Sequence, residues 1–193
     1  MIRIALDPGH GGKDPGATYK GITEAKLVFN ERQEDGVTVA DGLTNRLAHY
    51  LRERGHSVLF TRSADENPPK RVRAERAISW GAQMYISVHV NAGGGSGSEV
   101  WINPDCRFVE GSKAIANVAL EVAQRLGVRS RGIKLTTDNA RARNVIGRLR
   151  NRMPAVLIEV AFIDNDLELL LLTNKIWRDA WAYNLAKRLA RIK

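Results

Sequence analysis

The sequence predicts an α/β fold in which helices cover both faces of a mostly parallel sheet. Short apolar segments that end in Pro, Gly or Asn alternate with longer segments whose apolar residues recur at helical spacing. The connections between the apolar segments are long, as the crossovers between parallel strands require. At 193 residues the chain fits one domain and can bury a substantial core.

Five segments are predicted to be strands, because they are short, mostly apolar and bounded by turn-forming residues. They are Ile2–Leu6, His56–Thr61, Met84–Asn91, Glu99–Asn103 and Met153–Ile163. A glycine-rich run at 92–97 follows the third of them. Because a strand pattern resumes directly after this run, we expect it to be a loop within one domain and not a linker between two.

Helices are predicted where apolar residues repeat every three or four positions. The predicted helices are Thr23–Phe29 with Thr23 as N-cap, Val39–Leu51, Arg71–Trp80, Ser112–Leu126 and two between Leu167 and Lys193. Gly55 is expected to end the second helix. The segment 129–152 is basic, and we expect it to be irregular. In the last helix, Trp177 and Trp181 are expected to pack in the core rather than to contact a membrane.

Lysine and arginine outnumber aspartate and glutamate by 30 to 21, which gives a formal net charge of +9. This balance favours a polyanionic partner such as nucleic acid, an anionic lipid surface or an anionic cell wall, although an arginine-rich surface alone accounts for it equally well. A single cysteine, Cys106, excludes an internal disulfide and a thiolate metal cage. No run of 18 apolar residues is present, and the N-terminus has no secretory-signal pattern, so we expect a protein made in the cytoplasm.

Three polar side chains lie at or near the carboxyl ends of predicted buried strands: His10, His89 and Glu159. In open α/β sheets, ligands bind just beyond these ends. Burying the carboxylate of Glu159 would be costly unless it were paired or bound to a metal ion. Each residue alone has an ordinary structural explanation, a salt bridge for the glutamate and satisfied hydrogen bonds for a histidine. Together, two imidazoles and a carboxylate at one sheet edge indicate a catalytic zinc site with an open position for water.

Four motifs occur in order along the chain: Leu6–Ala17 (LDPGHGGKDPGA), Gly21–Glu24 (Gly-x-x-Glu), Ile86–Ala92 (ISVHVNA) and Pro154–Asn165 (PAVLIEVAFIDN). In this combination the chain resembles the zinc-dependent N-acetylmuramoyl-L-alanine amidases of the amidase-3 family, which include bacterial autolysins and phage endolysins. The resemblance covers nearly the whole chain. It implies a zinc-exopeptidase-like three-layer sandwich with a twisted sheet of about six strands.

The resemblance also implies roles for individual residues. His10, Glu24 and His89 would bind Zn2+, and Glu159 would be the catalytic glutamate. Two neutral imidazoles and one carboxylate would leave the site with a net positive charge, which lowers the pKa of bound water toward ~7. Glu159 would take a proton from that water and later give it to the leaving amine, while zinc polarises the amide carbonyl.

The chain departs from the family pattern between Glu24 and the helix that ends at Gly55, where it has about ten extra residues. Glu34 is therefore a rival to Glu24 as the third ligand. We favour Glu24, because the motif from His10 to Gly21 matches without an insertion. The segment 29–39 is then expected to be an added loop or hairpin beside the cleft.

These assignments predict a peptidoglycan hydrolase that cleaves the amide bond between the lactyl group of N-acetylmuramic acid and L-alanine. Residues 1–193 are expected to form a single catalytic domain without a separate cell-wall-binding domain, as in a phage or prophage endolysin that reaches the cell wall when it is released at lysis. The positive charge would draw the enzyme to an anionic cell-wall or outer-membrane surface. We expect neither nucleic-acid binding nor oligomerisation.

Two alternatives remain open from the residues. A zinc peptidase of the same fold would use the same side chains on peptide termini. A basic nucleic-acid-binding protein would use the arginines of 129–152. That segment has no helix-turn-helix or aromatic platform, and such a protein would leave His10, His89 and Glu159 unexplained.

Overall fold

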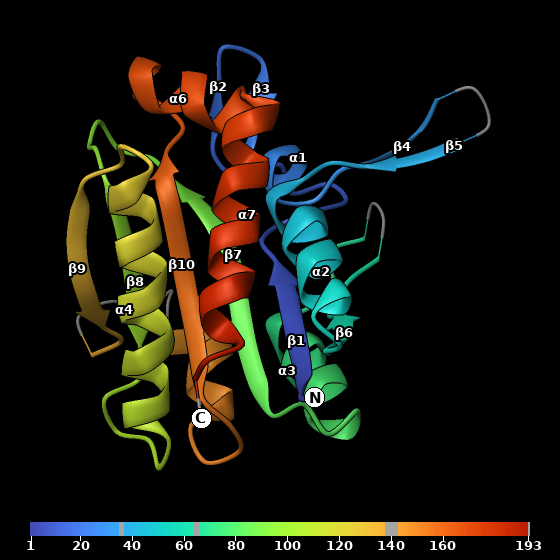
Figure 1. The fold of residues 1–193 in the computed structure, drawn as a ribbon, viewed down its shortest axis with the longest axis vertical. Helices are drawn as coiled ribbons and strands as arrows, with labels where there is room; N and C mark the ends of the chain where they lie inside the picture. Colours follow the sequence, from blue (N-terminus) through green and yellow to red (C-terminus); the bar gives the residue numbers. More distant parts are fainter. Residues whose placement is uncertain (35–36, 64–65, 138–142, 193) are drawn as a thin grey trace.

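A six-stranded sheet forms the centre of the computed structural model, which describes residues 1–34, 37–63, 66–137 and 143–192 (Figure 1). Within these ranges, the side chains of 32–34, 37–39 and 143–144 are not described. The strand order across the sheet is β6-β1-β7-β10-β8-β9. The strand bounds are β1 Arg3–Pro8, β6 Ser57–Phe60, β7 Met84–Asn91, β8 Ser98–Ile102, β9 Ser130–Leu135 and β10 Ala155–Phe162.

The sheet is mostly parallel, as predicted. β1 is parallel to its neighbours β6 and β7, β7 is parallel to β10, and β9 is parallel to β8, whereas β8 runs antiparallel to β10. The carboxyl ends of β1, β7 and β10 therefore meet at one edge of the sheet, which is the upper edge in Figure 1.

Helices cover both faces of this sheet, which confirms the predicted three-layer α/β arrangement (Figure 1). In the described part of the chain they are α1 Glu24–Val28, α2 Leu43–Glu53, α3 Lys70–Ser79, α4 Val109–Arg125, α5 Arg143–Ile146, the 3-10 helix η1 Gly147–Leu149, α6 Asp166–Thr173 and α7 Lys175–Leu189. Helices α2, α4 and α7 enclose the larger core on one face, where Trp177 and Trp181 are buried as predicted. Helices α3, α5 and η1 enclose a smaller core on the other face. No helix of the described residues is both long and apolar enough to cross a membrane.

The alternation of side chains along the strands places three polar groups on one face. Ala5 in β1, Tyr85 in β7 and Leu157 in β10 belong to the smaller core, on the face that α3 covers. Because alternate residues of a strand point to the same face, polar residues two or four positions further along point to this face too. These residues are Asp7, His89 and Glu159.

A two-stranded hairpin occupies part of the segment in which a helix is predicted. β4 (Glu31–Glu34) and β5 (Val37–Ala40) pair antiparallel and extend away from the body of the molecule (Figure 1). The prediction that the second helix begins at Val39 is wrong, because Val39 belongs to β5 and α2 begins at Leu43. The loop or hairpin expected at 29–39 is therefore a hairpin.

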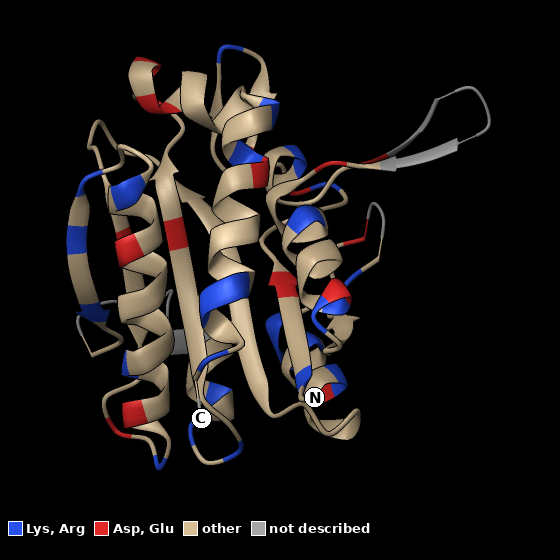
Figure 2. Cartoon of the chain, viewed as in Figure 1, with Lys and Arg blue, Asp and Glu red and all other residues tan. Residues whose placement is uncertain are grey.

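The expectation that 129–152 is irregular is also wrong for its described residues. It contains the edge strand β9, followed by α5 and η1. All residues of β9 are half-buried or exposed, and this edge strand carries basic residues (Figure 2). It therefore lacks the continuous apolar run by which the interior strands are predicted. Residues 138–142 lie outside the described part of the chain. A small hairpin of β2 (Thr18–Tyr19) and β3 (Ile22–Thr23) was not predicted either.

Asp7, near the carboxyl end of β1, joins three elements through a buried ion pair. Its carboxylate accepts hydrogen bonds from Thr61, from Ser87 of β7 (Oγ to Oδ2, 2.7 Å) and from Arg73 of α3 (Nη1 to Oδ1, 3.0 Å). Burial raises the pKa of Asp7, but Arg73 and the two hydroxyl groups outweigh burial and hold this pKa below its ordinary value. The charged form of Asp7 therefore stabilises the fold.

We expect Asp7→Asn to lower the free energy of unfolding by about 3 kcal/mol at neutral pH, because it leaves Arg73 buried without its counter-charge. The folded-state pKa of Asp7 is depressed, so its contribution is fully present above the pKa of the unfolded chain, about 3.9. It is lost as the pH falls through the folded-state value. Urea denaturation over a series of pH values measures both effects.

The exposed Asp105 provides a matched control. Asp105→Asn removes the same charge at the surface and should change the free energy of unfolding by less than about 0.5 kcal/mol. If Asp7→Asn kept the stability and the acid profile of the wild type, the stabilising role of the Asp7–Arg73 pair would be disproved.

Candidate metal centre

The glycine-rich turn after β1 brings His10 to the edge of the sheet. His10 has a φ of 56°, a left-handed backbone conformation that non-glycine residues rarely adopt. A Cβ atom at Gly9 would lie 2.5 Å from the His89 ring, and one at Gly16 would lie 2.6 Å from Oε2 of Glu24. Glycine is therefore required at both positions, because the backbone passes directly against these two side chains.

Glu24 enters the same site from the first turn of α1. Thr23 caps this helix, since its hydroxyl accepts a hydrogen bond from the Lys26 backbone N–H (3.4 Å). The Glu24 side chain is buried, and its carboxylate accepts hydrogen bonds from the backbone N–H groups of Ala17 and Val90, each at 3.0 Å. These two bonds fix the carboxylate between the loop that follows β1 and the end of β7.

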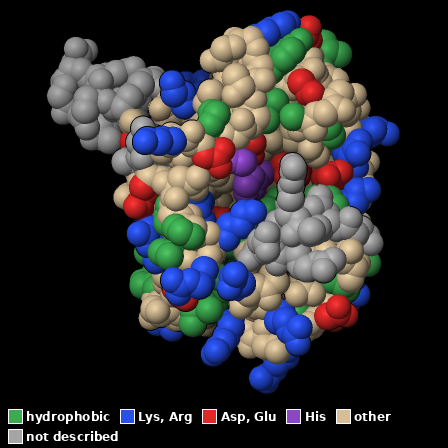
Figure 3. Space-filling view, turned by 180° about the vertical axis from the view of Figure 1, so that it is seen from behind, with side chains coloured by type: hydrophobic (Ala, Val, Ile, Leu, Met, Phe, Trp, Pro, Cys, Tyr) green, Lys and Arg blue, Asp and Glu red, His purple; other side chains and the backbone are tan. Residues whose placement is uncertain are grey.

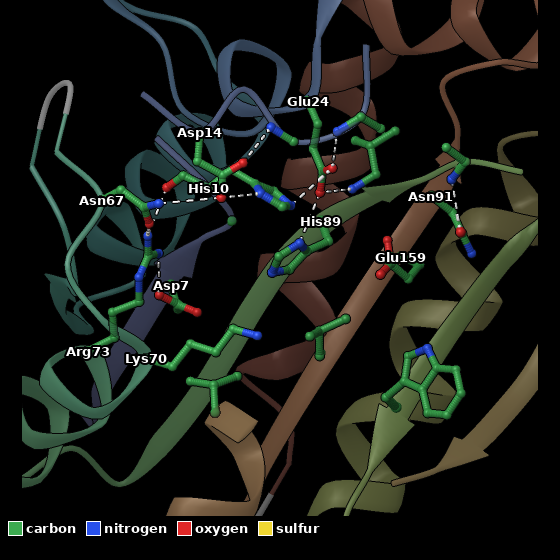
Figure 4. A pocket seen from close by; sticks show the side chains of 18 residues that line it. Asp7, His10, Asp14, Glu24, Asn67, Lys70, Arg73, His89, Asn91 and Glu159 are labelled. Carbon is green, nitrogen blue, oxygen red and sulfur yellow. Dashed lines mark hydrogen bonds and ion pairs between the residues drawn. The ribbon is translucent and has the colours of Figure 1, made fainter. Parts of the chain in front are cut away.

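His10, Glu24 and His89 form a compact cluster of possible metal ligands (Figure 4). One ligand atom of each residue lies within 4.8 Å of the others. His10 Nε2 is 3.2 Å from Oε2 of Glu24, and His89 Nδ1 is 2.9 Å from Oε1. The structure therefore brings together three residues that are far apart in the sequence.

Strong electrostatic coupling links these three side chains. Burial lowers the pKa of His10, but its hydrogen bonds to Glu24 and Asp14 outweigh burial and raise the pKa to about 9. Burial also lowers the pKa of His89, but the hydrogen bond and the charge of Glu24 outweigh burial and raise this pKa above its ordinary value. The two histidines in turn hold the pKa of Glu24 far below its ordinary value, although burial raises it. The cluster thus favours positive charge beside the carboxylate. Two imidazoles and one carboxylate are also a donor set that suits zinc.

Asp14 orients the His10 ring by contacting Nδ1, the ring nitrogen that does not face Glu24. Its Oδ2 is 2.9 Å from His10 Nδ1, and its carboxylate also accepts hydrogen bonds from the Gly16 backbone N–H (3.0 Å) and from Asn67 (3.3 Å). This contact directs Nε2 of the imidazole toward Glu24, as carboxylates behind metal-bound histidines do. The prediction from sequence did not include Asp14, although its place four residues after His10 in the glycine-rich motif was a usable signal.

Glu159 of β10 lies beside this cluster. It pairs in register with His89 of β7, and both side chains point to the face that α3 covers. Among the described residues, Oε2 of Glu159 is buried without a hydrogen-bond partner. Burial raises the pKa of Glu159 to about 7; the charges of Glu24 and Glu99 add to this effect, and His89 opposes it. A carboxyl group in this state can take up or release a proton near neutral pH.

A charge pair between a buried glutamate and a half-buried arginine adjoins Glu159 on its other side. Glu99 of β8 pairs in register with Glu159, and its carboxylate accepts hydrogen bonds from Arg131 of β9 (Nε to Oε2, 2.6 Å) and from Asn91 of β7 (3.2 Å). Arg131 therefore balances the charge of Glu99. Sequence reasoning missed this pair, because it depends on the edge strand β9.

The side chains of the metal-ligand cluster, Asp14 and Glu159 line a cleft of about 610 Å³. Figure 3 shows the histidine side chains at the surface on the face opposite α2, α4 and α7. The four residues predicted from the sequence, His10, Glu24, His89 and Glu159, all line it. Other polar side chains in its wall are Asp7, Asp14, Asn67, Lys70, Arg73 and Asn91. The rival ligand Glu34 lies in β4, and its side chain is outside the described part of the structure.

Comparison with known proteins identifies the family. The profile of the N-acetylmuramoyl-L-alanine amidase family Amidase_3 matches residues 4–191. The chain is 32% identical over 187 residues to the sporulation-specific N-acetylmuramoyl-L-alanine amidase of Bacillus subtilis, with 97% of the chain covered. It is 32% identical over 200 residues to the endolysin of Bacillus phage SPP1, with 98% covered. The chain spans 65% of the length of each of these two relatives.

Solved structures share the fold. The catalytic domain of the N-acetylmuramoyl-L-alanine amidase CwlV from Paenibacillus polymyxa superimposes with a TM-score of 0.75 and 25% identity over 100% of both chains. An N-acetylmuramoyl-L-alanine amidase of Nostoc punctiforme superimposes with a TM-score of 0.78 and 23% identity, over 97% of this chain and 94% of that one. From the profile match, which covers nearly all of its residues, the chain belongs to the N-acetylmuramoyl-L-alanine amidase family.

Proposed function

We propose that this protein is a zinc-dependent peptidoglycan hydrolase that cleaves the amide bond between the lactyl group of N-acetylmuramic acid and L-alanine. The observation that supports this most strongly is the convergence of His10, Glu24, His89 and Glu159 in one cleft. Membership of the amidase family supplies the reaction, and the cleft supplies side chains suited to it.

His10, Glu24 and His89 would hold the zinc ion. Their donor atoms are close enough together to share one cation, and the buried carboxylate of Glu24 places a negative charge between the two imidazoles. When bound, zinc supplies Lewis acidity toward the amide carbonyl and lowers the pKa of a water molecule. Asp14 would keep His10 in the orientation that binding needs.

Glu159 would carry the proton in this reaction. Its carboxylate accepts a proton from the attacking water and delivers it to the amide nitrogen as the C–N bond breaks. The products are the free lactyl carboxylate and the amine of L-alanine, so water is consumed and no covalent enzyme intermediate forms. Oε2 of Glu159 suits this role, because it has no hydrogen-bond partner among the described residues.

The proposal also covers the domain organisation of the enzyme and the place where it acts. Residues 1–193 would act as one catalytic domain on the cell wall, and the net charge of +9 would attract it to anionic wall polymers or an outer-membrane surface. Similarity to a phage endolysin supports release at lysis as the route to the wall. A zinc peptidase of the same fold is the alternative, and its products would differ.

Digestion of purified peptidoglycan, with and without a chelator, tests the proposed reaction. We expect new L-alanine N-termini to appear without new reducing sugar ends, and activity to fall by at least about 100-fold on metal removal and to return with added zinc. Full activity in the metal-free protein would contradict the proposal, and cleavage only within peptides would favour the peptidase.

Replacing the two rival glutamates separately tests the third ligand. We expect Glu24→Ala to bind zinc at least about tenfold more weakly than the wild type, because it removes the carboxylate between the two histidines. Glu34→Ala should keep the zinc content of the wild type. Zinc content after dialysis, measured by atomic emission, distinguishes the two. Full zinc retention in Glu24→Ala would show that Glu24 is not the third ligand.

Glu159→Ala separates proton transfer from metal binding. We expect this variant to keep one zinc ion per chain and to lose turnover by about 100-fold or more, as the loss of a general base does. Glu121→Ala, which removes a glutamate from the exposed surface of α4, is the matched control and should retain full turnover. If Glu159→Ala lost its zinc instead, Glu159 would be a ligand and not the base.

A further inference from the structure

Two basic residues of α3 line the cleft, and the structure uses them differently. Lys70 and Arg73 are three positions apart, so they lie on the same side of the helix. Arg73 is fully engaged: it donates to Asp7 (3.0 Å) and to the backbone oxygens of Pro8 (2.6 Å) and His10 (2.8 Å). Its guanidinium thus fixes the end of β1 and the loop that carries His10.

Lys70, in contrast, makes no polar contact that would stabilise the fold within the described part of the chain. It is the first residue of α3, its side chain is exposed, and its ammonium group points into the cleft in Figure 4. Among the described residues it has neither an ion-pair partner nor a hydrogen-bond partner. A cation in the first turn of a helix is disfavoured by the helix dipole, so the stability of α3 does not explain Lys70.

Most carboxylates of the cleft already have partners. Asp7 is paired with Arg73, Asp14 with His10, and Glu24 with both histidines. Glu159 and Lys70 lie on different sides of the cleft in Figure 4. Among the described residues that line the cleft, Lys70 is therefore a cation without a partner, and none of them supplies an anion for it.

The substrate of the proposed reaction has a carboxylate close to the cleaved bond, where Lys70 could bind it. On the sugar side, the lactyl carboxyl group is consumed in the scissile amide and carries no charge. On the peptide side, the residue after L-alanine is a glutamate joined through its side-chain carboxyl, so its α-carboxyl group remains free unless it is amidated. An extended residue spans about 3.5 Å, which places this group one residue from the cleaved bond.

We propose that Lys70 binds this free carboxylate and makes the enzyme selective for stem peptides that are not amidated at this position. The inference rests on the proposed function and adds a specificity-determining residue to it. A charge-assisted contact forms with the carboxylate but not with the carboxamide. Lys70 acts on the leaving peptide and does not take part in the proton transfer.

Two synthetic substrates test the inference directly: muramoyl-L-alanyl-γ-D-glutamyl peptides that carry either the free α-carboxylate or the α-carboxamide. We expect Lys70→Met to lower kcat/KM about tenfold on the carboxylate substrate and to leave kcat/KM on the carboxamide substrate unchanged. Lys70→Arg should keep most of the wild-type selectivity, because it keeps the charge.

Arg71→Met is the matched control. It removes the same charge from the same turn of α3, but Arg71 does not line the cleft and is paired with Glu75 (2.6 Å). This variant should behave as the wild type on both substrates. An equal loss on both substrates in Lys70→Met, or no loss on either, would overturn the role of Lys70 while leaving the proposed reaction intact. If the wild-type enzyme released L-alanine N-termini from neither substrate, the proposed function itself would fail.

Discussion

The carboxylate of Glu24 is the interaction on which the candidate site depends. A buried carboxylate is costly unless it is fully hydrogen-bonded, and this one is satisfied from two sides. The backbone N–H groups of Ala17 and Val90 hold it in place, and His10 and His89 approach its two oxygens. The contact joins the loop after β1, the first turn of α1 and the end of β7. The Glu24 carboxylate therefore stabilises the local fold and also holds the possible metal ligands close together.

The charges around this carboxylate are arranged by the order of the strands. β1, β7, β10 and β8 are neighbours, and each contributes an ionisable residue to the same face. Those residues are Asp7, His89, Glu159 and Glu99. Arg73 balances the charge of Asp7, and Arg131 balances the charge of Glu99. His89 and Glu159 lie between these two ion pairs. Asp7 and Glu99 each have an arginine as ion-pair partner and help to build the cleft. Within the described ranges, His89 and Glu159 have no such partner and are available for chemistry in it.

Much of this arrangement could be predicted from the sequence. Continuous apolar runs predicted the interior strands, and polar residues at their ends predicted His10, His89 and Glu159 as one site. Glu24 needed the family resemblance, because a glutamate in a short amphipathic segment looks like any surface residue. Lys70 and Arg131 could not have been found, since their importance depends on how α3 packs and on β9. That edge strand has no apolar run, and Val39 fitted a helical spacing although it lies in a hairpin.

X-ray absorption spectroscopy of the zinc-loaded protein would examine the ligand set at the metal itself. We expect a first shell of nitrogen and oxygen atoms at about 2.0–2.1 Å, with the outer-shell scattering of two imidazole rings. In His89→Ala this scattering should fall to that of one ring. A sulfur ligand, or scattering from two rings that persisted in His89→Ala, would contradict the assignment of His10, Glu24 and His89 to one metal ion.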